Sequence, residues 1–321
     1  MKYYFAPMEG ITGHRFREAH HTFFKGIDKY FTPFISPNKN RTLRSRELTD
    51  VLPEHNKGIY VVPQILTNQA EDFLWTADKL QQLGYEEVNL NLGCPSGTVV
   101  SKHKGAGFLE EPDRLCAFLE QIFSACSLKI SIKTRIGMYE PEEFERLLQI
   151  YNQYPLEELI IHPRVREDYY KNKPNLQVFG QALQQSRATV CYNGDIFSQK
   201  DFEEFTLRFQ EVNCVMLGRG LLANPGLVCE LKTKEPMDKQ TLKAFHDRVL
   251  AEYEELFSGD RNVLFKMKEL WFYMIHAFDN PGKYPKKIRK AEKLKDYKQI
   301  VEDLFLQLEI SENPEFQMPA S

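Results

Sequence analysis

One short stretch of the chain carries side chains that could take part in chemistry: Val88-Asn89-Leu90-Asn91-Leu92-Gly93-Cys94-Pro95. With a two-residue period it predicts a strand that has Asn89 and Asn91 on one face. Buried amides are costly unless they are hydrogen-bonded, and Pro95 favours an extended Cys94 that presents its thiol at the strand end. A lone cysteine would be interpreted as an inert core residue. The amide pair beside it indicates a site instead.

Other predicted strands also end in side chains that could bind a ligand: Pro7, Met8 and Glu9; Gln64; Lys133 and Arg135; His162 and Arg164. Within residues 129–137, Ile130 and Ile132 alternate with polar residues, so the polar stripe is expected to face inward. An inert sheet would have little reason to finish strand after strand in hydrogen-bonding groups.

Two glycine-containing loops follow the last two predicted strands. They read Asn193-Gly194-Asp195 and Gly218-Arg219-Gly220, and Asn224-Pro225 then looks like a helix N-cap with Pro at the first helical position. Loops after strands seven and eight are the usual phosphate site of an α/β barrel, because glycines let backbone N–H groups approach the oxygens. Either loop alone could equally be an ordinary turn. Together they predict a phosphate-bearing cofactor.

The elements that must position these residues alternate between short β-like runs and amphipathic helical patterns, which predicts a parallel sheet. Helical patterns cover residues 71–83, 112–124 and 141–154. Eight strands in about 220 residues fit an α/β fold of the (β/α)8 TIM-barrel type better than a doubly wound sheet. The predicted strands lie near residues 3–7, 30–34, 59–64, 86–92, 129–135, 158–162, 189–193 and 213–217.

Length and composition agree with a barrel and a smaller appended domain. The chain has 321 residues, 42% of them hydrophobic, and a net charge of −3. Its six cysteines form no C-x-x-C pair, which argues against a zinc ribbon or a redox dithiol and predicts reduced thiols. The start, MKYYFAPMEG, does not resemble a signal peptide, and no apolar run is long enough to span a membrane. A cytoplasmic protein with no metal site is expected.

The C-terminal part of the chain has a different pattern. We assign residues 1–235 to the barrel, 241–310 to a small all-α domain and 311–321 to a loose end, with a linker at 232–240. Helices are predicted at 241–257, 261–278 and 287–308. Residues 283–298 hold eight Lys or Arg and two acidic residues. Such a segment is either a solvated helix face, which the residues alone favour, or a contact for a phosphate backbone.

Taken in order, the motifs resemble the tRNA-dihydrouridine synthase family. The resemblance covers about residues 3–230 and rests on APMEGIT with Phe16-Arg17, Gln64, NLNLGCP, KTRIG, HPR, YNGDI and LGRG. It implies a TIM barrel that binds FMN, a helical RNA-binding domain, and an oxidoreductase that uses NADPH to reduce a uridine of tRNA to 5,6-dihydrouridine. A monomer is expected.

The resemblance also implies roles for residues. Hydride from reduced FMN would add to carbon 6 of uracil, and Cys94 would protonate carbon 5, since a thiol with a pKa near 8.5 is mostly protonated at neutral pH. Asn91 would hold the uracil against Cys94. The uridine must first be unstacked from the RNA. No separate nucleotide fold is visible for NADPH, so it would use the same flavin face before RNA binds, which gives ping-pong kinetics.

In this interpretation, Lys133 and Gln64 lie at the pyrimidine edge of the flavin, and His162 and Arg164 address phosphate or ribose. Arg135 could lie at the pyrimidine edge of the flavin or contact phosphate or ribose. The implied cofactor ligands are Pro7, Met8, Glu9, Gln64, Lys133, His162, Asn193, Gly194, Asp195, Gly218 and Arg219. The implied substrate or RNA contacts are Arg135, Arg164, Lys286, Lys287, Arg289 and Lys290.

Three alternatives stay open. The first is another FMN barrel that acts on a free pyrimidine, similar to dihydroorotate dehydrogenase. The second is a dihydrouridine synthase that acts on ribosomal RNA. The third is a non-catalytic RNA-binding protein with a degenerate barrel. The basic helical tail argues against a small acidic substrate, and the intact Cys94, Lys133 and phosphate loops argue against a degenerate barrel.

Overall fold

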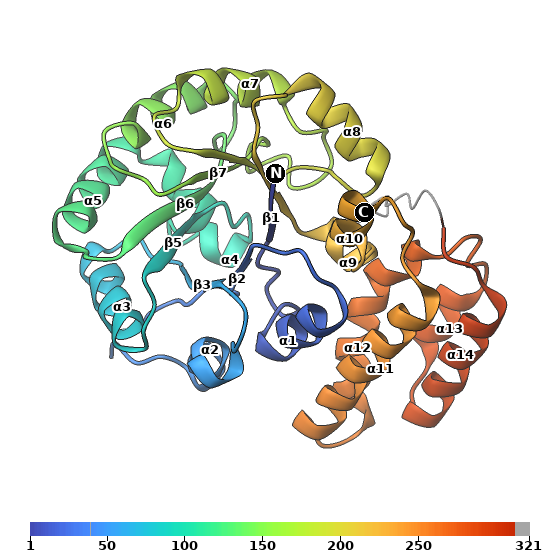
Figure 1. Cartoon of the computed structure of the whole chain (residues 1–321). Helices are drawn as coiled ribbons and strands as arrows, with labels where there is room; N and C mark the ends of the chain where they lie inside the picture. Colours follow the sequence, from blue (N-terminus) through green and yellow to red (C-terminus); the bar gives the residue numbers. More distant parts are fainter. Residues whose placement is uncertain (39, 312–321) are drawn as a thin grey trace. The chain divides into compact units, whose positions relative to one another are not determined.

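The structure is a computed structural model that describes residues 1–38 and 40–311 (Figure 1). It contains two compact units. Unit 1 comprises Met1–Glu9, Asp28–Gly194 and Phe209–Met216, and unit 2 comprises Gly10–Ile27, Asp195–Arg208 and the described chain from Leu217 onward. The predicted domain boundaries at residues 235 and 241 stay a prediction. All of the predicted loose end except Ser311 lies outside the described residues.

The strands form one parallel sheet in the order β3-β2-β1-β9-β8-β7-β6-β5-β4. Its two outer strands, β3 and β4, are separated in sequence only by Pro63, which has no N–H for a ladder hydrogen bond. They are the halves of one predicted strand, so the sheet is a nearly closed eight-stranded barrel and the predicted fold is confirmed. The strands are β1 (Lys2–Phe5), β2 (Lys29–Phe31), β3 (Val61–Val62), β4 (Gln64–Ile65), β5 (Glu87–Leu92), β6 (Lys129–Arg135), β7 (Leu159–His162), β8 (Val190–Tyr192) and β9 (Cys214–Leu217).

The helices of unit 1 include the three predicted from their amphipathic patterns, and α3, α5, α6 and α7 lie on the outside of the barrel (Figure 1). In α5, the buried residues Leu115, Phe118, Leu119 and Ile122 recur at helical spacing, which makes one apolar stripe. The helical segments are α2 (Ser45–Val51), η1 (Pro53–His55), α3 (Ala70–Gln82), α4 (Gly97–Val100), η2 (Gly105–Glu110), α5 (Pro112–Ala125), α6 (Glu143–Tyr151) and α7 (Leu176–Gln185), where η marks a 3-10 helix.

Unit 2 is helical. Its segments are α1 (His14–Phe23), α8 (Gln199–Arg208), α9 (Arg219–Ala223), α10 (Leu227–Thr233), α11 (Lys239–Leu256), α12 (Asp260–Met274), η3 (Ile275–Ala277), α13 (Tyr284–Lys290) and α14 (Leu294–Gln307). Helix α1 packs on α11, where the Phe16 and Phe245 rings meet edge to face with centroids 5.5 Å apart. This contact explains why residues 10–27 group with the C-terminal helices. Among the described residues, no helix is both long and apolar enough for a membrane span.

Two predictions for the C-terminal part were wrong in detail. The predicted helix 287–308 is two helices, because Ala291 and Lys293 are both extended, with ψ of 128° and 140°. Helix α12 supplies partners for the exposed backbone at this break: Asp260 Oδ2 accepts from the Leu294 N–H at 2.8 Å, and Lys268 Nζ donates to the Ala291 carbonyl at 2.5 Å. The predicted linker begins inside α10, which extends to Thr233.

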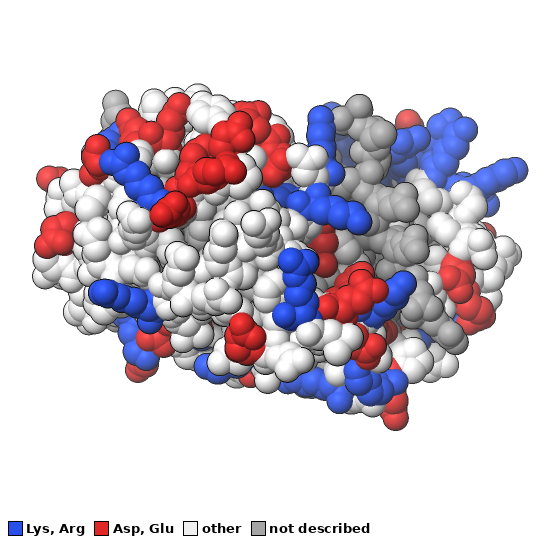
Figure 2. Space-filling model, turned by 90° about the horizontal axis from the view of Figure 1, so that it is seen from above, with Lys and Arg blue, Asp and Glu red and all other residues white. Residues whose placement is uncertain are grey.

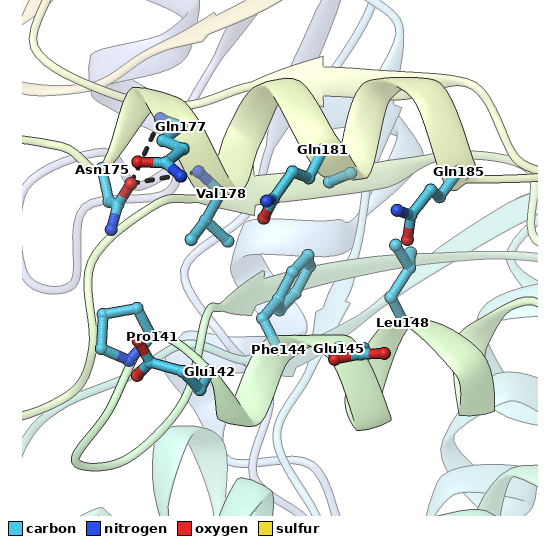
Figure 3. A pocket seen from close by; sticks show the side chains of 11 residues that line it. Pro141, Glu142, Phe144, Glu145, Leu148, Asn175, Gln177, Val178, Gln181 and Gln185 are labelled. Carbon is cyan, nitrogen blue, oxygen red and sulfur yellow. Dashed lines mark hydrogen bonds between the residues drawn. The ribbon is translucent and has the colours of Figure 1, made fainter.

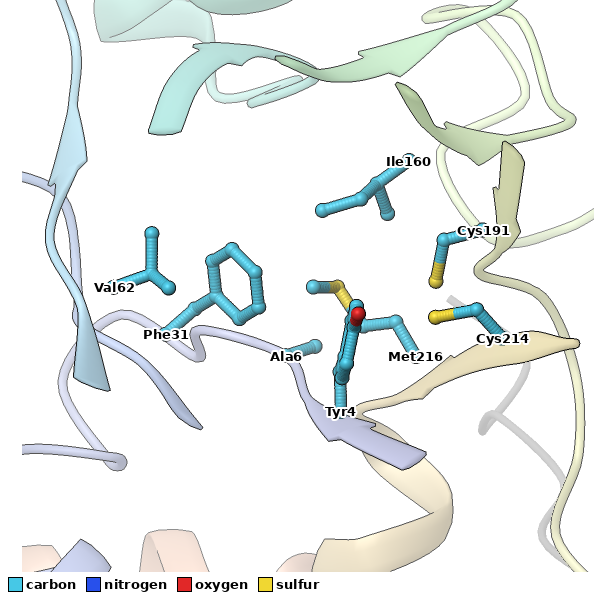
Figure 4. Close-up of a cluster of buried hydrophobic side chains, with 8 residues drawn as sticks. All are labelled: Tyr4, Ala6, Phe31, Val62, Ile160, Cys191, Cys214 and Met216. Carbon is cyan, nitrogen blue, oxygen red and sulfur yellow. The ribbon is translucent and has the colours of Figure 1, made fainter. Parts of the chain in front are cut away.

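The barrel interior is apolar on the side formed by β1, β2, β3, β7, β8 and β9. Side chains from these strands point toward one another and fill the space between them (Figure 4). This cluster consists of Tyr4, Ala6, Phe31, Val62, Ile160, Cys191, Cys214 and Met216, all at most 4% exposed.

A buried group of charges lies at the N-terminal end of the barrel strands. Lys29 Nζ is 2.8 Å from a carboxylate oxygen of Glu87 and 3.1 Å from one of Glu158. Ser131 donates to Glu87 at 3.1 Å and the Tyr4 hydroxyl donates to Glu158. We call Lys29, Glu87 and Glu158 the lysine–glutamate cluster. Because both carboxylates are nearly fully buried, each needs these partners to stay charged.

Replacing Lys29 with Met should lower the free energy of unfolding by about 3–5 kcal/mol near neutral pH, because two buried carboxylates lose their cation. Desolvation already raises the pKa of Glu87, and loss of Lys29 should raise it further. A carboxyl whose pKa is higher in the folded state stabilises that state below its unfolded pKa, and this is lost as the pH rises. The variant should therefore regain stability as the pH falls toward about 5.

Chemical denaturation of both proteins at several pH values measures this effect. Lys79→Met is a matched control, since it removes a lysine of α3 whose side chain is 42% exposed, and it should change stability by no more than about 0.5 kcal/mol. An equal loss in the two variants, or a Lys29→Met deficit that does not depend on pH, would contradict the assignment.

Candidate active site

The backbone of Cys94, which follows β5, is held on both sides. Asn91 Oδ1 accepts hydrogen bonds from the N–H groups of Gly93 and Cys94, at 3.0 and 2.9 Å. On the other side, the Cys94 carbonyl accepts from the Ala106 N–H at 3.1 Å. Gly105 has φ +57°, and a Cβ there would lie 2.9 Å from the Cys94 carbonyl oxygen. The loop therefore requires glycine at this position and presents Cys94 in a fixed place.

The inner face of β5 is hydrogen-bonded to its neighbours in one continuous row. Asn91 Nδ2 donates to Gln64 Oε1 at 2.7 Å, and Gln64 Nε2 donates to Asn89 Oδ1 at 2.8 Å. Asn89 Nδ2 then donates to Ser131 Oγ at 3.0 Å, and Ser131 donates to Glu87. We call these five residues the amide ladder. It confirms that Asn89 and Asn91 face inward, and it links the Cys94 loop to the lysine–glutamate cluster.

The ladder gives Gln64 and Asn91 positioning roles. Gln64 is 1% exposed, and both ends of its amide are already hydrogen-bonded to asparagines. A flavin contact by Gln64, as predicted, would use its second N–H or its second carbonyl lone pair. The predicted contact of Asn91 with uracil would likewise use its remaining N–H. Both contacts stay predictions.

The thiol of Cys94 is half-buried, and desolvation raises its pKa. The carboxylate of Glu9 raises this pKa further, whereas the charges of Arg135 and Lys133 lower it by attracting the thiolate. Because desolvation is the largest of these effects, Cys94 is a protonated thiol at neutral pH. That is the state a proton donor needs.

Lys133 lies inside the barrel beside Asn91 in the β5–β6 register. Within residues 1–38 and 40–311, its ammonium has no hydrogen-bond or ion-pair partner. Desolvation, and then the charge of Arg135, lower the pKa of Lys133 to about 8. An anionic group next to Lys133 would restore its charged form. The residue is therefore suited to hold an anion at the inner face of the barrel.

Arg135 is 1% exposed, and its guanidinium connects two loops. Its three nitrogens donate to the backbone carbonyls of Gly93 at 3.1 Å, Val165 at 2.9 Å and Tyr169 at 2.9 Å. It also lies over the Tyr170 ring, 5.5 Å from the centroid. These contacts make Arg135 a positioning residue for the loops after β5 and β7. These hydrogen bonds do not test the predicted contact of Arg135 with the substrate.

His162 and Arg164 contact each other at the end of β7. Arg164 Nη1 is 2.9 Å from His162 Nε2, and since a guanidinium only donates, the neutral histidine carries its proton on Nδ1. Arg164 Nε also donates to the Asn172 carbonyl at 2.5 Å. The His162 ring lies 5.9 Å from that of Tyr170. Both residues are buried. The predicted contact with phosphate or ribose would therefore have to be made by the small part of each side chain that stays accessible.

The predicted residues after β1 lie close enough to Cys94 to influence it. Pro7 and Met8 are half-buried, and Glu9 is exposed and pairs with Arg46 at 2.7 Å. The effect of Glu9 on the pKa of Cys94 shows that the end of β1 and the thiol are within electrostatic reach. Flavin binding by these three residues remains a prediction.

The predicted phosphate loops are divided between the two units. In unit 1, Asn193 Nδ2 donates to the Met216 carbonyl at 2.8 Å. A Cβ on Gly194 would lie 2.0 Å from the Tyr192 hydroxyl, so this position requires glycine. The side chain of Asn193 thus joins the ends of β8 and β9.

In unit 2, Asp195 and Arg219 form an ion pair at 2.5 Å. A Cβ on Gly220 would lie 2.2 Å from the Ile196 carbonyl oxygen, which requires a glycine beside that loop. Helix α9 begins directly after Gly218, and the helix predicted to start with Pro225 begins two residues later, as α10 at Leu227 with Gly226 as its N-cap. Asn224 Oδ1 instead accepts from the Gly226 N–H at 3.0 Å, one turn before α10.

The predicted RNA contacts of the tail lie on α13 in unit 2. Lys286, Lys287, Arg289 and Lys290 are all exposed. Lys287 Nζ is 5.2 Å from the centroid of the Tyr284 ring. None of the four has an ion-pair partner in the part of the chain that the structure describes. These side chains are available to bind anions.

Sequence reasoning missed the lysine–glutamate cluster and Tyr170. A signal for Glu87 was present, because it has the same parity as Asn89 and Asn91 in β5 and so shares their inward face. No sequence signal pairs Lys29 with Glu87, since the two residues are 58 positions apart.

A cleft of about 390 Å3 lies between α6 and α7, outside the barrel (Figure 3). Glu142 and Glu145 line it together with Phe144, Leu148 and several amide side chains, and no Lys or Arg takes part. None of the predicted site residues borders this cleft. Its carboxylates make it unsuitable for a phosphate.

Comparison with known proteins agrees with the motif pattern. The chain matches the dihydrouridine synthase (Dus) family over residues 4–316. A probable tRNA-dihydrouridine synthase of Staphylococcus aureus is 30% identical over 249 residues, which are 74% of this chain and 73% of the relative. The tRNA-dihydrouridine(16) synthase of Yersinia pestis is 29% identical over 245 residues, which are 74% and 78% of the two chains.

Solved structures show the same fold. Histamine dehydrogenase from Rhizobium sp. 4-9 aligns with a TM-score of 0.53 and 11% identity, over 73% of this chain and 46% of that chain. Morphinone reductase in complex with tetrahydroNAD gives a TM-score of 0.51 and 12% identity, over 75% and 89%. At such low identity these similarities concern the fold alone.

The parallel barrel, the polar inner face of β5 and β6, and the presented thiol define a β/α-barrel enzyme. The match over nearly the whole length makes this assignment narrower: the chain belongs to the dihydrouridine synthase family, and the enzyme is an oxidoreductase.

The neighbours of Cys94 should move its pKa in opposite directions. Glu9→Gln should lower the pKa of Cys94, because it removes a negative charge that disfavours the thiolate. Lys133→Met should raise it, because it removes a positive charge that favours the thiolate. The pH dependence of iodoacetamide labelling at Cys94, followed by peptide mass spectrometry, measures these shifts. Shifts of the same sign would show that neither charge acts on the thiol directly.

Proposed function

We propose that this protein reduces a uridine of tRNA to 5,6-dihydrouridine with FMN as its cofactor, NADPH as the reductant and Cys94 as the proton donor. The observation that carries the proposal is the combination of a protonated thiol just after β5 with an ammonium on the inner face of β6 that has no partner among the described residues. Family membership and the tRNA-dihydrouridine synthases among the relatives support the choice of substrate.

The residues of the barrel fit a flavin. The FMN, reduced by NADPH, would supply hydride to carbon 6 of the uracil. Lys133 offers an uncompensated positive charge at the barrel's inner face, which suits the electron-rich pyrimidine edge of a reduced flavin. Asn193 and Gly194, at the ends of β8 and β9, are proposed to contact its phosphate. Gly218 and Arg219 are proposed separately as phosphate ligands.

Cys94 completes the reduction. Addition of hydride at carbon 6 leaves an enolate on the uracil, and the Cys94 thiol gives its proton to carbon 5. Because its pKa is raised, the thiol keeps this proton until the substrate draws it away, and solvent then reprotonates the thiolate. Asn91 fixes the Cys94 backbone and so controls where the proton is delivered.

Flavin retention should depend on Lys133 and Arg219. The purified protein should be yellow with one FMN, and Lys133→Ala or Arg219→Ala should lower the flavin content, because each removes the positive charge of a proposed flavin ligand. Absorbance after gel filtration measures the content. Lys79→Ala removes a lysine of α3 whose side chain is 42% exposed, and it is the control for loss of a lysine. A colourless wild type that takes up no added FMN would refute flavin chemistry.

Cys94→Ala should separate the two half-reactions. The variant should retain its flavin and its reduction by NADPH, but formation of dihydrouridine should slow by roughly 10²–10⁴-fold, the usual contribution of a general acid. Cys116→Ala is a matched control, since it removes another half-buried thiol, on α5. Mapping dihydrouridine in tRNA and ribosomal RNA gives the readout. Wild-type turnover by Cys94→Ala would show that the thiol is structural. Dihydrouridine in ribosomal RNA alone would show that ribosomal RNA, and not tRNA, is the substrate.

Residues 283–298 are proposed to bind the RNA backbone. Neutralising Lys286, Lys287, Arg289 and Lys290 together should weaken tRNA binding and flatten its dependence on salt, because fewer counterions are released. Binding of an unmodified tRNA transcript at several salt concentrations measures the slope. NADPH oxidation should not change. Equal slopes for the variant and the wild type would leave α13 as a solvated helix face.

A further inference from the structure

Helices α12 and α13 of unit 2 border a groove whose floor is apolar. It consists of two adjoining cavities, of about 460 and 420 Å3, which share Lys268 as a lining residue. Trp271, Ile275 and Ile288 form the floor and are at most 6% exposed. The groove lies entirely within unit 2 and contains none of the residues assigned to the flavin.

Two aromatic side chains of α12 line the groove and are open to solvent. Phe265 is 67% exposed and Phe272 is 39% exposed. They are seven residues apart, which is two helical turns, so they lie on one face of α12 about 10 Å apart along its axis. Phe272 meets the Tyr273 ring edge to face at 5.0 Å. Neither phenylalanine is needed to fill the helical core, so their exposure suits a contact with a partner.

The same groove is positively charged. Its lining includes Arg261, Lys268, Lys286 and Arg289 but no Asp or Glu. Lys268 is bonded to a backbone carbonyl, and the other three have no ion-pair partner among residues 1–38 and 40–311. On the face seen in Figure 2, some basic and acidic side chains form small groups of one kind and others lie side by side. The cleft between α6 and α7 is the opposite case, with carboxylates and no cation.

We propose that this groove binds a single-stranded segment of the RNA substrate, whose unpaired bases stack on Phe265 and Phe272 while Arg261, Lys286 and Arg289 contact its phosphates. The inference rests on the proposed function and adds a stacking site to it. Exposed aromatic rings between cations are what a flexible nucleic-acid strand requires. An apolar peptide would cover the rings but would leave three cations without partners.

The test compares full-length proteins loaded with FMN for binding of an unmodified tRNA transcript. In Phe265→Leu/Phe272→Leu the groove stays apolar but loses its stacking faces, so affinity should fall by about five- to 100-fold at every salt concentration, with an unchanged salt slope. In Lys286→Gln/Arg289→Gln the slope should fall by about 0.7 for each lost phosphate contact. Leu207→Ala/Leu306→Ala, in which two leucines at least 75% exposed are truncated outside the groove, should bind as the wild type does.

A direct signal of stacking comes from Phe272→Trp. This variant should keep wild-type affinity, and its added indole fluorescence should be quenched by the tRNA. Wild-type affinity in the double leucine variant, or no quenching in Phe272→Trp, would overturn the stacking site even if the enzyme still forms dihydrouridine. A wild type that forms no dihydrouridine but binds tRNA through these residues would instead overturn the proposed reaction.

Discussion

The structure depends on one buried cation shared by two carboxylates. Lys29 is the counter-ion of both Glu87 and Glu158, so the lysine–glutamate cluster has an excess negative charge that water cannot reach. Hydrogen bonds from Ser131 and Tyr4 offset that excess. These partners come from separate strands, and a barrel that brings them together must be closed in the right register. The cluster therefore acts against any slip between strands.

The interior of the barrel is divided between two kinds of surface. Tyr4, Phe31 and the other residues of the apolar cluster fill one side, whereas β4, β5 and β6 contribute the amide ladder and Lys133 to the other. The hydrogen-bonded side chains of β4, β5 and β6 lie on one wall, where the ladder fixes Asn91 and Asn91 fixes the Cys94 backbone. The amide ladder thus positions both the proposed ligand contacts and the proposed proton donor.

Much of this arrangement was predictable because it repeats along the sequence. The two-residue period in β5 and β6 predicted the inward face, and the polar strand ends predicted the edge on which the candidate site lies. Partnerships across the barrel were not predictable. The sequence holds no signal that the Gln64 amide joins Asn89 to Asn91. The helical break at Ala291 was missed for the same reason, since the groups that stabilise it belong to α12.

The amide ladder has a direction. Every member from Asn91 onward donates to the next, and the row ends at Glu87, which as a carboxylate can only accept. Reversing one amide would set two donors or two acceptors against each other. We therefore expect a substitution at any of the five positions to be tolerated only if its neighbours change with it. In a lineage of such enzymes, these residues should vary together or not at all.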